Sequence, residues 1–208
     1  MPGSAPGTGC DVRRRVVRAL ALAWMLPAGA ARAGAAPSVE HVRLSEAARR
    51  LQAGGYVLMM RHAQTEPGVG DPPGFRLDDC ATQRQLSAAG RAQAARVGAT
   101  MRDAGIVLSD VLSSAWCRCQ DTARLAFGRY RVWTPLNSFF ADPAPAARTT
   151  QEVLALAARH RDTNLMLVTH QVNISAAFGV STAPSEVVAG RWRDGRWVEA
   201  FRFVPASD

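Results

Sequence analysis

Two short apolar runs, each leading to a histidine, constrain the fold of this chain more than any other feature. The first is YVLMM at 56–60, which Arg61 and His62 follow directly, and the second is NLMLVTH at 164–170. An unbroken apolar run of this length is typical of a strand that is buried on both faces of a parallel sheet. Ligands bind beyond the carboxyl ends of such strands, so we expect His62 and His170 at one shared edge.

Helical patterns alternate with these strands along the rest of the chain. We expect helices at 38–55, 87–105, 116–128 and 149–162 and the start of another helix at 173–179, together with a strand within 106–114 and a strand at 129–134. The Asp194-Gly195 pair within 186–204 favours a type I′ turn, which predicts an antiparallel hairpin at one edge. The sequence therefore predicts an α/β fold, a three-layer sandwich with a mostly parallel sheet and a C-terminal antiparallel edge hairpin.

The N-terminal segment has the layout of a secretory leader. A basic cluster at 13–15 precedes an apolar stretch at 16–26, and Ala-Arg-Ala at 31–33 fits a cleavage site. The apolar stretch is too short to span a bilayer well. We therefore expect a signal peptide at 1–33, one domain at 34–208, no stable membrane anchor, and a periplasmic or secreted protein.

The charge of the chain bears on a nucleic acid partner, and its cysteines bear on a disulfide or a metal site. The net charge is +8, but the arginines are scattered and form no single basic stripe, so we expect no nucleic acid partner. Three cysteines, Cys80, Cys117 and Cys119, follow the leader. In an oxidising compartment, a bridge from Cys80 to either of the others would leave one free thiol. No fourth ligand has recognisable spacing, so we expect no metal.

The residues expected at the sheet edge suit a phosphoryl group. Arginines bind its oxygens through bidentate hydrogen bonds, and Arg61 and Arg118 are the candidates. A histidine with a pKa near ~6.5 can be neutral and attack phosphorus, or be charged and bind oxygen. Two histidines in one pocket could divide these roles.

Three ordered blocks resemble the histidine phosphatase superfamily, also called the phosphoglycerate mutase-like superfamily. They are LMMRHAQT at 58–65, SSAWCRCQDTA at 113–123 and LVTHQ at 167–171, while LSAAGRAQA at 86–94 resembles the helix between the first two. The family usually has Arg-His-Gly where this chain has Ala63, and alanine matters there if φ is positive. The resemblance implies a phosphoglycerate mutase-like fold.

The resemblance also implies roles for the site residues. His62 would be the nucleophile that forms a phosphohistidine, and Arg61, Arg118 and His170 would hold the phosphoryl oxygens. Water would then release phosphate, and no metal or other cofactor would be needed. Thr65 is a further candidate for phosphate binding.

The proton donor for the leaving oxygen stays open. The family usually places a Glu or Asp on an insert after the second block, and Asp142 has about that position. The alternative role of Asp142 is to form the turn before Pro143. Glu66 and Asp71, on the long loop at 66–85, are the other candidates.

Other polar residues beside these blocks fit structural roles. Gln83 and Arg84 could line the substrate entrance, but a solvated part of the loop suits them better. Ser113 and Ser114 are expected to end a strand and cap the following helix.

The leading hypothesis is an exported phosphatase that hydrolyses a small-molecule phosphomonoester, with phosphorylated envelope sugars as one candidate class. A phosphohistidine phosphatase or a mutase-like enzyme is the alternative among enzymes. A non-catalytic binding protein for anionic envelope sugars would keep Arg61 and Arg118 without needing the nucleophile. No sequence feature specifies the oligomeric state.

Overall fold

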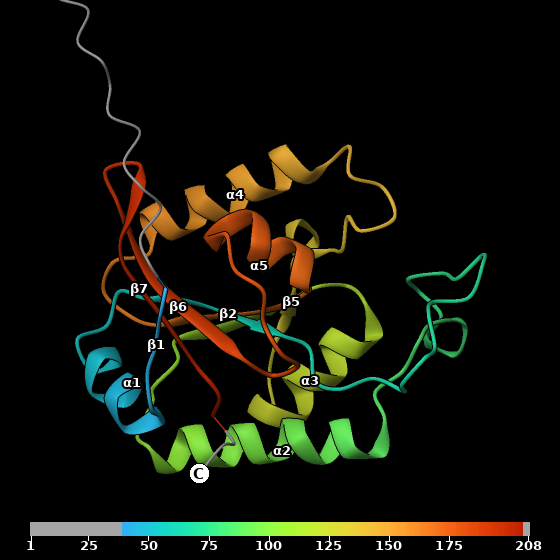
Figure 1. Cartoon of the computed structure of the whole chain (residues 1–208), viewed down its shortest axis with the longest axis horizontal. Coiled ribbons are helices and arrows are strands. Elements are labelled where there is room, and N and C mark those ends of the chain that lie inside the picture. Colours follow the sequence, from blue (N-terminus) through green and yellow to red (C-terminus); the bar gives the residue numbers. More distant parts are fainter. Residues whose placement is uncertain (1–38, 206–208) are drawn as a thin grey trace, which may run out of the picture. The chain divides into compact units, whose positions relative to one another are not determined.

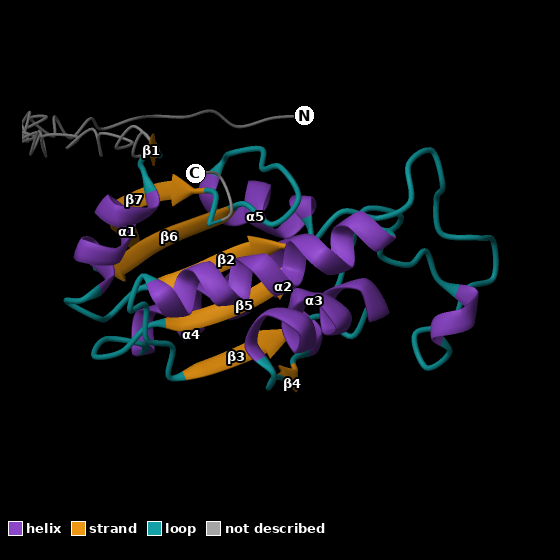
Figure 2. Ribbon diagram, turned by 90° about the horizontal axis from the view of Figure 1, so that it is seen from below, coloured by secondary structure: helices purple, strands orange, loops and turns teal. Residues whose placement is uncertain are grey.

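A mixed sheet, in the strand order β1-β7-β6-β2-β5-β3-β4, organises the domain (Figure 1, Figure 2). The computed structural model describes residues 39–205, which belong to a compact unit at 35–208. The expected leader at 1–33 lies outside the described residues. The strands are β1 (Glu40–His41), β2 (Val57–Arg61), β3 (Asp110–Ser113), β4 (Arg131–Val132), β5 (Leu165–Thr169), β6 (Val187–Arg193) and β7 (Arg196–Phe203).

Strand β2 separates a parallel half of the sheet from an antiparallel pair. It runs parallel to β5, which is followed outward by β3 and β4, and it runs antiparallel to β6. Strands β6 and β7 form the predicted hairpin, whose turn residues Asp194 and Gly195 have φ of 51° and 76°, as a type I′ turn requires. The short strand β1 pairs with β7, so it lies outside the hairpin.

Helices cover both faces of the sheet. They are α1 (Leu44–Leu51), α2 (Ala88–Asp103), α3 (Cys117–Phe127), α4 (Ala146–Arg159) and α5 (Gln171–Phe178), with short 3-10 turns at η1 (Cys80–Thr82) and η2 (Thr134–Leu136). Helices α1, α2 and α3 lie on one face, and α4 and α5 on the other (Figure 1). The predicted three-layer α/β sandwich is thus confirmed.

Several predicted boundaries differ from the structure. The first helix does not fill 38–55, because Glu40 and His41 pair with β7 before the helix begins at Leu44. Helix α4 begins at Ala146, earlier than the threonines that were expected to start it. Strand β4 is shorter than the expected strand at 129–134, whereas β3 lies within 106–114 and ends at Ser113, as expected.

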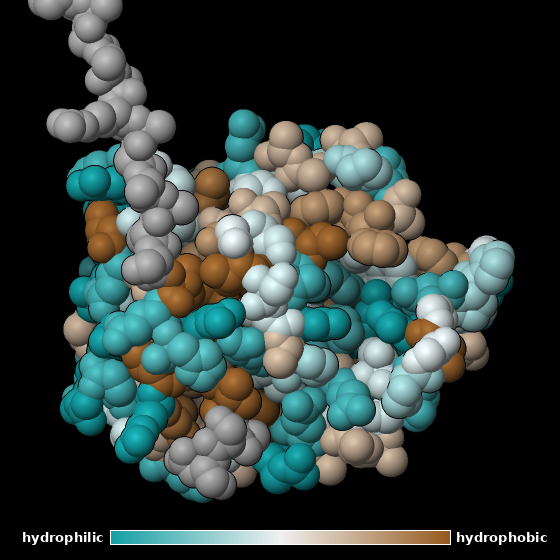
Figure 3. Space-filling view, in the orientation of Figure 1, coloured by the Kyte–Doolittle hydropathy of each residue, from teal (hydrophilic) through white to brown (hydrophobic). Residues whose placement is uncertain are grey.

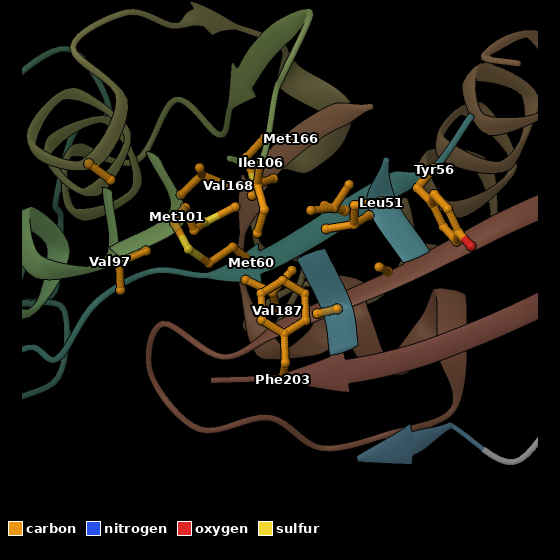
Figure 4. Close-up of a cluster of buried hydrophobic side chains, with 14 of the residues drawn as sticks. Leu51, Tyr56, Met60, Val97, Met101, Ile106, Met166, Val168, Val187 and Phe203 are labelled. Carbon is orange, nitrogen blue, oxygen red and sulfur yellow. The ribbon is translucent and has the colours of Figure 1, made fainter. Parts of the chain in front are cut away.

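Alternate residues of β2 enter two different cores, which explains its unbroken apolar run. Leu58 and Met60 belong to the core that α1, α2 and α3 cover, part of which Figure 4 shows. Val57 and Met59 belong to the core beneath α4 and α5. All four side chains are at most 1% exposed. Because neither face of β2 meets water, no polar residue interrupts the strand until Arg61.

Two glycines allow α2 to approach neighbouring backbone closely. A Cβ atom on Gly90 would lie 1.8 Å from the carbonyl oxygen of Gln64, and one on Gly98 would lie 1.8 Å from that of Ala126. Gly90 therefore brings α2 against the segment that follows His62. Gly98 brings the same helix against the end of α3.

We predict that Gly98→Ala destabilises the protein although alanine is the better helix former. The added methyl must displace the backbone at Ala126, and overpacking of this kind costs about 1–3 kcal/mol. The free energy of unfolding in urea measures the effect. Ala95→Ser, at an exposed position of α2, is the control and should change stability by less than about 0.5 kcal/mol. An unchanged unfolding midpoint for Gly98→Ala would contradict the close packing of α2 on α3.

Candidate active site

The two histidines at the strand ends lie side by side. In the register of β2 and β5, Arg61 pairs with Thr169, and the His62 N–H donates to the Thr169 carbonyl oxygen at 3.0 Å. The ring centroids of His62 and His170 are 5.5 Å apart, with 67° between the ring planes. Both residues are 4% exposed. The structure therefore brings the two imidazoles together in one buried site at the sheet edge.

A backbone hydrogen bond determines which nitrogen of His62 carries the proton. Its Nδ1 lies 2.8 Å from the Ala63 carbonyl oxygen, which can only accept, so Nδ1 is protonated and Nε2 keeps a lone pair. Burial lowers the pKa of His62 to about 3, and the charges of Arg118 and Arg61 act in the same direction. The imidazole is therefore neutral near pH 7, the state in which Nε2 can act as a nucleophile.

Ala63 fits the position where glycine was expected from the resemblance. Among the described residues other than glycine, only Ser185 and Asp194 have a positive φ, so the backbone of Ala63 is not strained. Its N–H donates to Thr122 Oγ1 at 3.0 Å, and its side chain is buried in a small cluster with Leu86. The alanine thus ties the backbone after His62 to α3.

A chain of hydrogen bonds orients His170. Its Nε2 lies 3.0 Å from Ser114 Oγ, which lies 3.1 Å from Asn137 Oδ1. The Ala115 N–H also donates to Asn137 Oδ1, so this oxygen receives the Ser114 hydroxyl proton. Ser114 Oγ then accepts from the Nε2–H of His170, which leaves Nδ1 for a ligand. Burial, and next the neighbouring His62, hold the pKa of His170 well below its ordinary value.

Ser114 therefore has a role besides the capping role expected from the sequence. The Trp116 N–H donates to Ser114 Oγ at 3.2 Å, as expected for a residue that precedes α3. The contact with His170 was not expected, and Asn137 had no role in the sequence analysis. Ser114 is 56 residues from His170 and 23 from Asn137, so no local sequence pattern indicates either contact.

Three guanidinium groups, those of Arg61, Arg84 and Arg118, act electrostatically on both histidines. Burial, and then the charge of Arg118, lower the pKa of both Arg61 and Arg84, as expected of like charges held close together. Each of the three has a buried Nε without a hydrogen-bond partner among the described residues. The cluster therefore combines surplus positive charge with unused donors, and this combination suits a multiply charged anion.

Arg61 and Arg118 are held in place by further contacts. Arg118 lies in the first turn of α3, is 3% exposed, and stacks on Trp116 with its guanidinium carbon 4.4 Å from the ring centroid. Arg61 Nη1 donates to the Thr182 carbonyl oxygen at 2.7 Å. These contacts reduce the number of side-chain rotamers, so the positive groups are oriented before any ligand arrives.

The expectation that Gln83 and Arg84 lie in a solvated loop is wrong. Gln83 is 4% exposed, and its Oε1 accepts the Cys117 N–H at 2.9 Å. Arg84 is half-buried, and its Nη1 donates to the Val69 carbonyl oxygen at 3.2 Å. The end of the loop at 66–85 packs against the start of α3, a long-range contact that its polar composition does not indicate.

A disulfide between Cys80 and Cys117 ties the same loop to α3, with the two Cα atoms 5.6 Å apart. Cys119 is free and buried, and burial raises the pKa of its thiol to about 12. The expected arrangement of one bridge and one thiol is therefore found, with Cys117 as the partner of Cys80. The loop projects beyond the carboxyl ends of the strands (Figure 2), and the bridge anchors it beside Arg118.

The candidate proton donors occupy different positions. Asp142 is exposed, and its Oδ1 accepts the Ala144 N–H at 3.0 Å, which is the turn-forming role. Glu66 is exposed as well. Asp71 Oδ1 accepts from Arg118 Nη1 at 2.9 Å. Of these three acids, the described contacts bring Asp71 alone to an arginine of the site.

Thr65 has a backbone role in the structure. It forms an isolated antiparallel bridge with Leu86, which lies just before α2. Its side chain is half-buried and makes no hydrogen bond to another described residue. The role of Thr65 in phosphate binding stays a prediction.

Hydrophilic residues predominate between the centre of the face shown in Figure 3 and the projecting loop.

Within residues 39–205, no group of three or more His, Cys, Asp or Glu side chains is placed to hold a metal ion. In the same part of the chain, every helix is too short or too polar to cross a membrane.

Comparisons with known proteins agree with this geometry. The model of the histidine phosphatase superfamily (branch 1) matches residues 57–136. No curated protein matches the sequence. The solved structure of the protein histidine phosphatase SixA complexed with tungstate has a TM-score of 0.54 at 12% identity, and the alignment covers 72% of this chain and 97% of SixA.

Two further phosphatases have the same fold. A phosphoserine phosphatase variant from Entamoeba histolytica, in complex with phosphoserine, has a TM-score of 0.53 at 15% identity, with 70% of this chain and 95% of that chain covered. The mycobacterial glucosyl-3-phosphoglycerate phosphatase has a TM-score of 0.52 at 20% identity, with coverages of 73% and 99%.

The family match includes the first two of the three sequence blocks, with His62 and Arg118. The third block, with His170, lies beside them in the structure. The solved structures share the phosphoglycerate mutase-like fold of this chain. Residues 57–136 thus match the histidine phosphatase superfamily (branch 1), and the fold of the chain is that of phosphoglycerate mutase-like phosphatases.

Proposed function

We propose that the chain is a phosphatase that hydrolyses a small-molecule phosphomonoester through a phosphohistidine on His62. One observation carries this proposal: the neutral, buried imidazole of His62 keeps an unprotonated Nε2 within the field of three guanidinium groups. Attack on phosphorus requires such a nucleophile together with positive charge for the phosphoryl oxygens. A site that only binds an anion needs the charge but not the nucleophile.

The proposed reaction has two steps. His62 Nε2 attacks phosphorus while the bond to the leaving oxygen breaks, and Arg61, Arg84 and Arg118 stabilise the charge on the other phosphoryl oxygens. A bound dianion favours the charged form of His170, whose Nδ1–H can then donate to the phosphoryl group. Water next attacks the phosphohistidine, which releases phosphate and restores the His62 imidazole. In this proposal the side-chain cations provide the positive charge that a metal ion provides in other phosphatases.

The proposal includes export by the leader at 1–33. The disulfide between Cys80 and Cys117 supports it, because such bonds persist in oxidising compartments and are rare in the cytosol.

We predict that His62→Ala lowers the hydrolysis of 4-nitrophenyl phosphate by about 10³-fold or more, because no other group supplies the attacking nitrogen. His160→Ala is the matched control, since this histidine ends α4 and contacts Thr163 outside the site; it should keep full activity. Rapid-quench experiments should trap an acid-labile, base-stable phosphoenzyme in the unchanged protein and none in His62→Ala.

Two outcomes would contradict this function. Retained hydrolysis by His62→Ala would remove the phosphohistidine from the reaction. Tight binding of inorganic phosphate by the unchanged protein, without hydrolysis of any phosphomonoester in a broad panel, would favour the non-catalytic binding protein.

We predict that Arg84→Gln raises the KM for 4-nitrophenyl phosphate about 10- to 100-fold. A hydrogen bond to a charged group is worth about 1.5–3 kcal/mol, and glutamine provides no charge. Arg96→Gln, at an exposed position of α2, removes the same charge away from the site and should leave KM within about twofold. Equal KM values for the two variants would show that Arg84 does not contact the phosphoryl group.

The low pKa of the proposed nucleophile also predicts a pH-dependent stability. The pKa of His62 is about 3 in the folded state, against an ordinary value of 6.5, so between these values the unfolded chain binds the additional proton. The neutral His62 imidazole therefore contributes to the free energy of unfolding above about pH 6.5, and this contribution is lost as the pH falls towards 3. The free energy of unfolding in urea should therefore drop between pH 7.5 and 4.5, and less steeply in His62→Gln. If the free energy of unfolding dropped equally in the unchanged protein and in His62→Gln, His62 would not be a neutral imidazole in the folded state.

A further inference from the structure

The proposed reaction needs a group that protonates the leaving oxygen, and the structure separates the candidates. Asp71 accepts from Arg118 Nη1 through both carboxylate oxygens, at 2.9 and 3.2 Å, and its Oδ1 also accepts the Arg84 N–H at 3.0 Å. Its side chain is 18% exposed, so it lies at the boundary between the buried site and solvent. Asp142 instead accepts a backbone N–H of its own turn, and Glu66 is exposed.

The contacts of Arg118 define where Asp71 stands relative to a bound phosphoryl group. Both contacts with Asp71 use Nη1, whereas Nε of Arg118 is buried and has no partner among the described residues. A phosphoryl group can therefore bind the edge of the guanidinium that contains Nε while Asp71 stays at Nη1. The carboxyl group and the phosphoryl group would then bind neighbouring edges of one guanidinium, with the carboxyl group on the side of the loop.

We propose that Asp71 is the proton donor to the leaving oxygen, an assignment that rests on the phosphatase function proposed above. When His62 Nε2 forms its bond to phosphorus, the phosphorus–oxygen bond breaks and the leaving oxygen takes the proton of the Asp71 carboxyl group as an alcohol. In the second step the Asp71 carboxylate takes a proton from water, and the oxygen of that water bonds to phosphorus. The bond from phosphorus to Nε2 breaks, and Asp71 and His62 return to their initial states.

The charges around the site are consistent with this cycle. A bound phosphoryl dianion competes with Asp71 for the positive charge of the Arg118 guanidinium. The disulfide between Cys80 and Cys117 holds the loop at α3, and the hydrogen bond from the Arg84 N–H holds Asp71 within the loop.

Leaving groups of different basicity test the assignment. Asp71→Asn keeps an oxygen that can accept from Arg118 and Arg84 but cannot donate an acidic proton. For phenyl phosphate, whose leaving group needs protonation, kcat/KM should fall by about 10²-fold or more. For 2,4-dinitrophenyl phosphate, whose leaving group departs as an anion, kcat/KM should fall by less than about fivefold. This ratio reports the phosphorylation step alone, and retained hydrolysis of the dinitrophenyl ester shows that the variant is folded.

The second step gives an independent readout. Without a group to accept a proton from water, the Asp71→Asn protein should accumulate phosphohistidine during turnover of 2,4-dinitrophenyl phosphate, detectable by rapid quench. Asp142→Asn and Glu66→Gln are the matched controls, and both should hydrolyse the two esters like the unchanged protein.

Three results would overturn the assignment. If kcat/KM of Asp71→Asn fell equally for both esters, Asp71 would be a residue that only positions Arg118 and Arg84. If kcat/KM of Asp142→Asn fell for phenyl phosphate alone, the proton donor would lie on the loop that contains Asp142. Hydrolysis of neither ester by the unchanged protein would overturn the phosphatase function itself, and the assignment of Asp71 with it.

Discussion

The pairing of β2 with β5 is the constraint on which the active site depends. The register that sets Arg61 opposite Thr169 makes the two strands end together, so that His62 and His170 leave the sheet at the same place. A slip of one residue would turn these side chains to the opposite face. Because the strands are buried on both faces, the two hydrophobic cores hold this register in place. The packing of the core and the geometry of the site are therefore set by the same contacts.

The site concentrates positive charge that folding alone does not favour. Burial and the charge of Arg118 lower the pKa of Arg61 and Arg84, and among the described residues only the carboxylate of Asp71 contacts the group. Burying charges without full compensation costs folding free energy. Such an arrangement persists only where the surrounding structure holds the charged groups in place. Here the end of β2, the first turn of α3, and a loop that is covalently attached to α3 together hold them. An incoming phosphoryl anion would supply the missing negative charge.

The parts of the site that could be predicted are those that depend on local patterns. His62 and His170 follow directly from apolar runs whose period identifies buried strands, and the same runs indicated the layered sheet. Arg84 and Asn137 could not be found in this way, because their contacts join segments that are distant in the chain. Asp142 was suggested by its place in the order of blocks. Its carboxylate accepts a backbone N–H of its own turn, a local role that the sequence also allows, and its catalytic role stays a prediction.

The geometry of a helix also decides which cysteine of the Cys-x-Cys pair is oxidised. Residues two apart on a helix point in directions about 160° apart, so only one of the two sulfurs can face the loop. Cys117 does so, while Cys119 points inward, where its sulfur lies 3.4 Å from His170 Nε2. A buried, protonated thiol reacts slowly in thiol–disulfide exchange. The position of each sulfur on α3 therefore selects Cys117, and not Cys119, as the partner of Cys80.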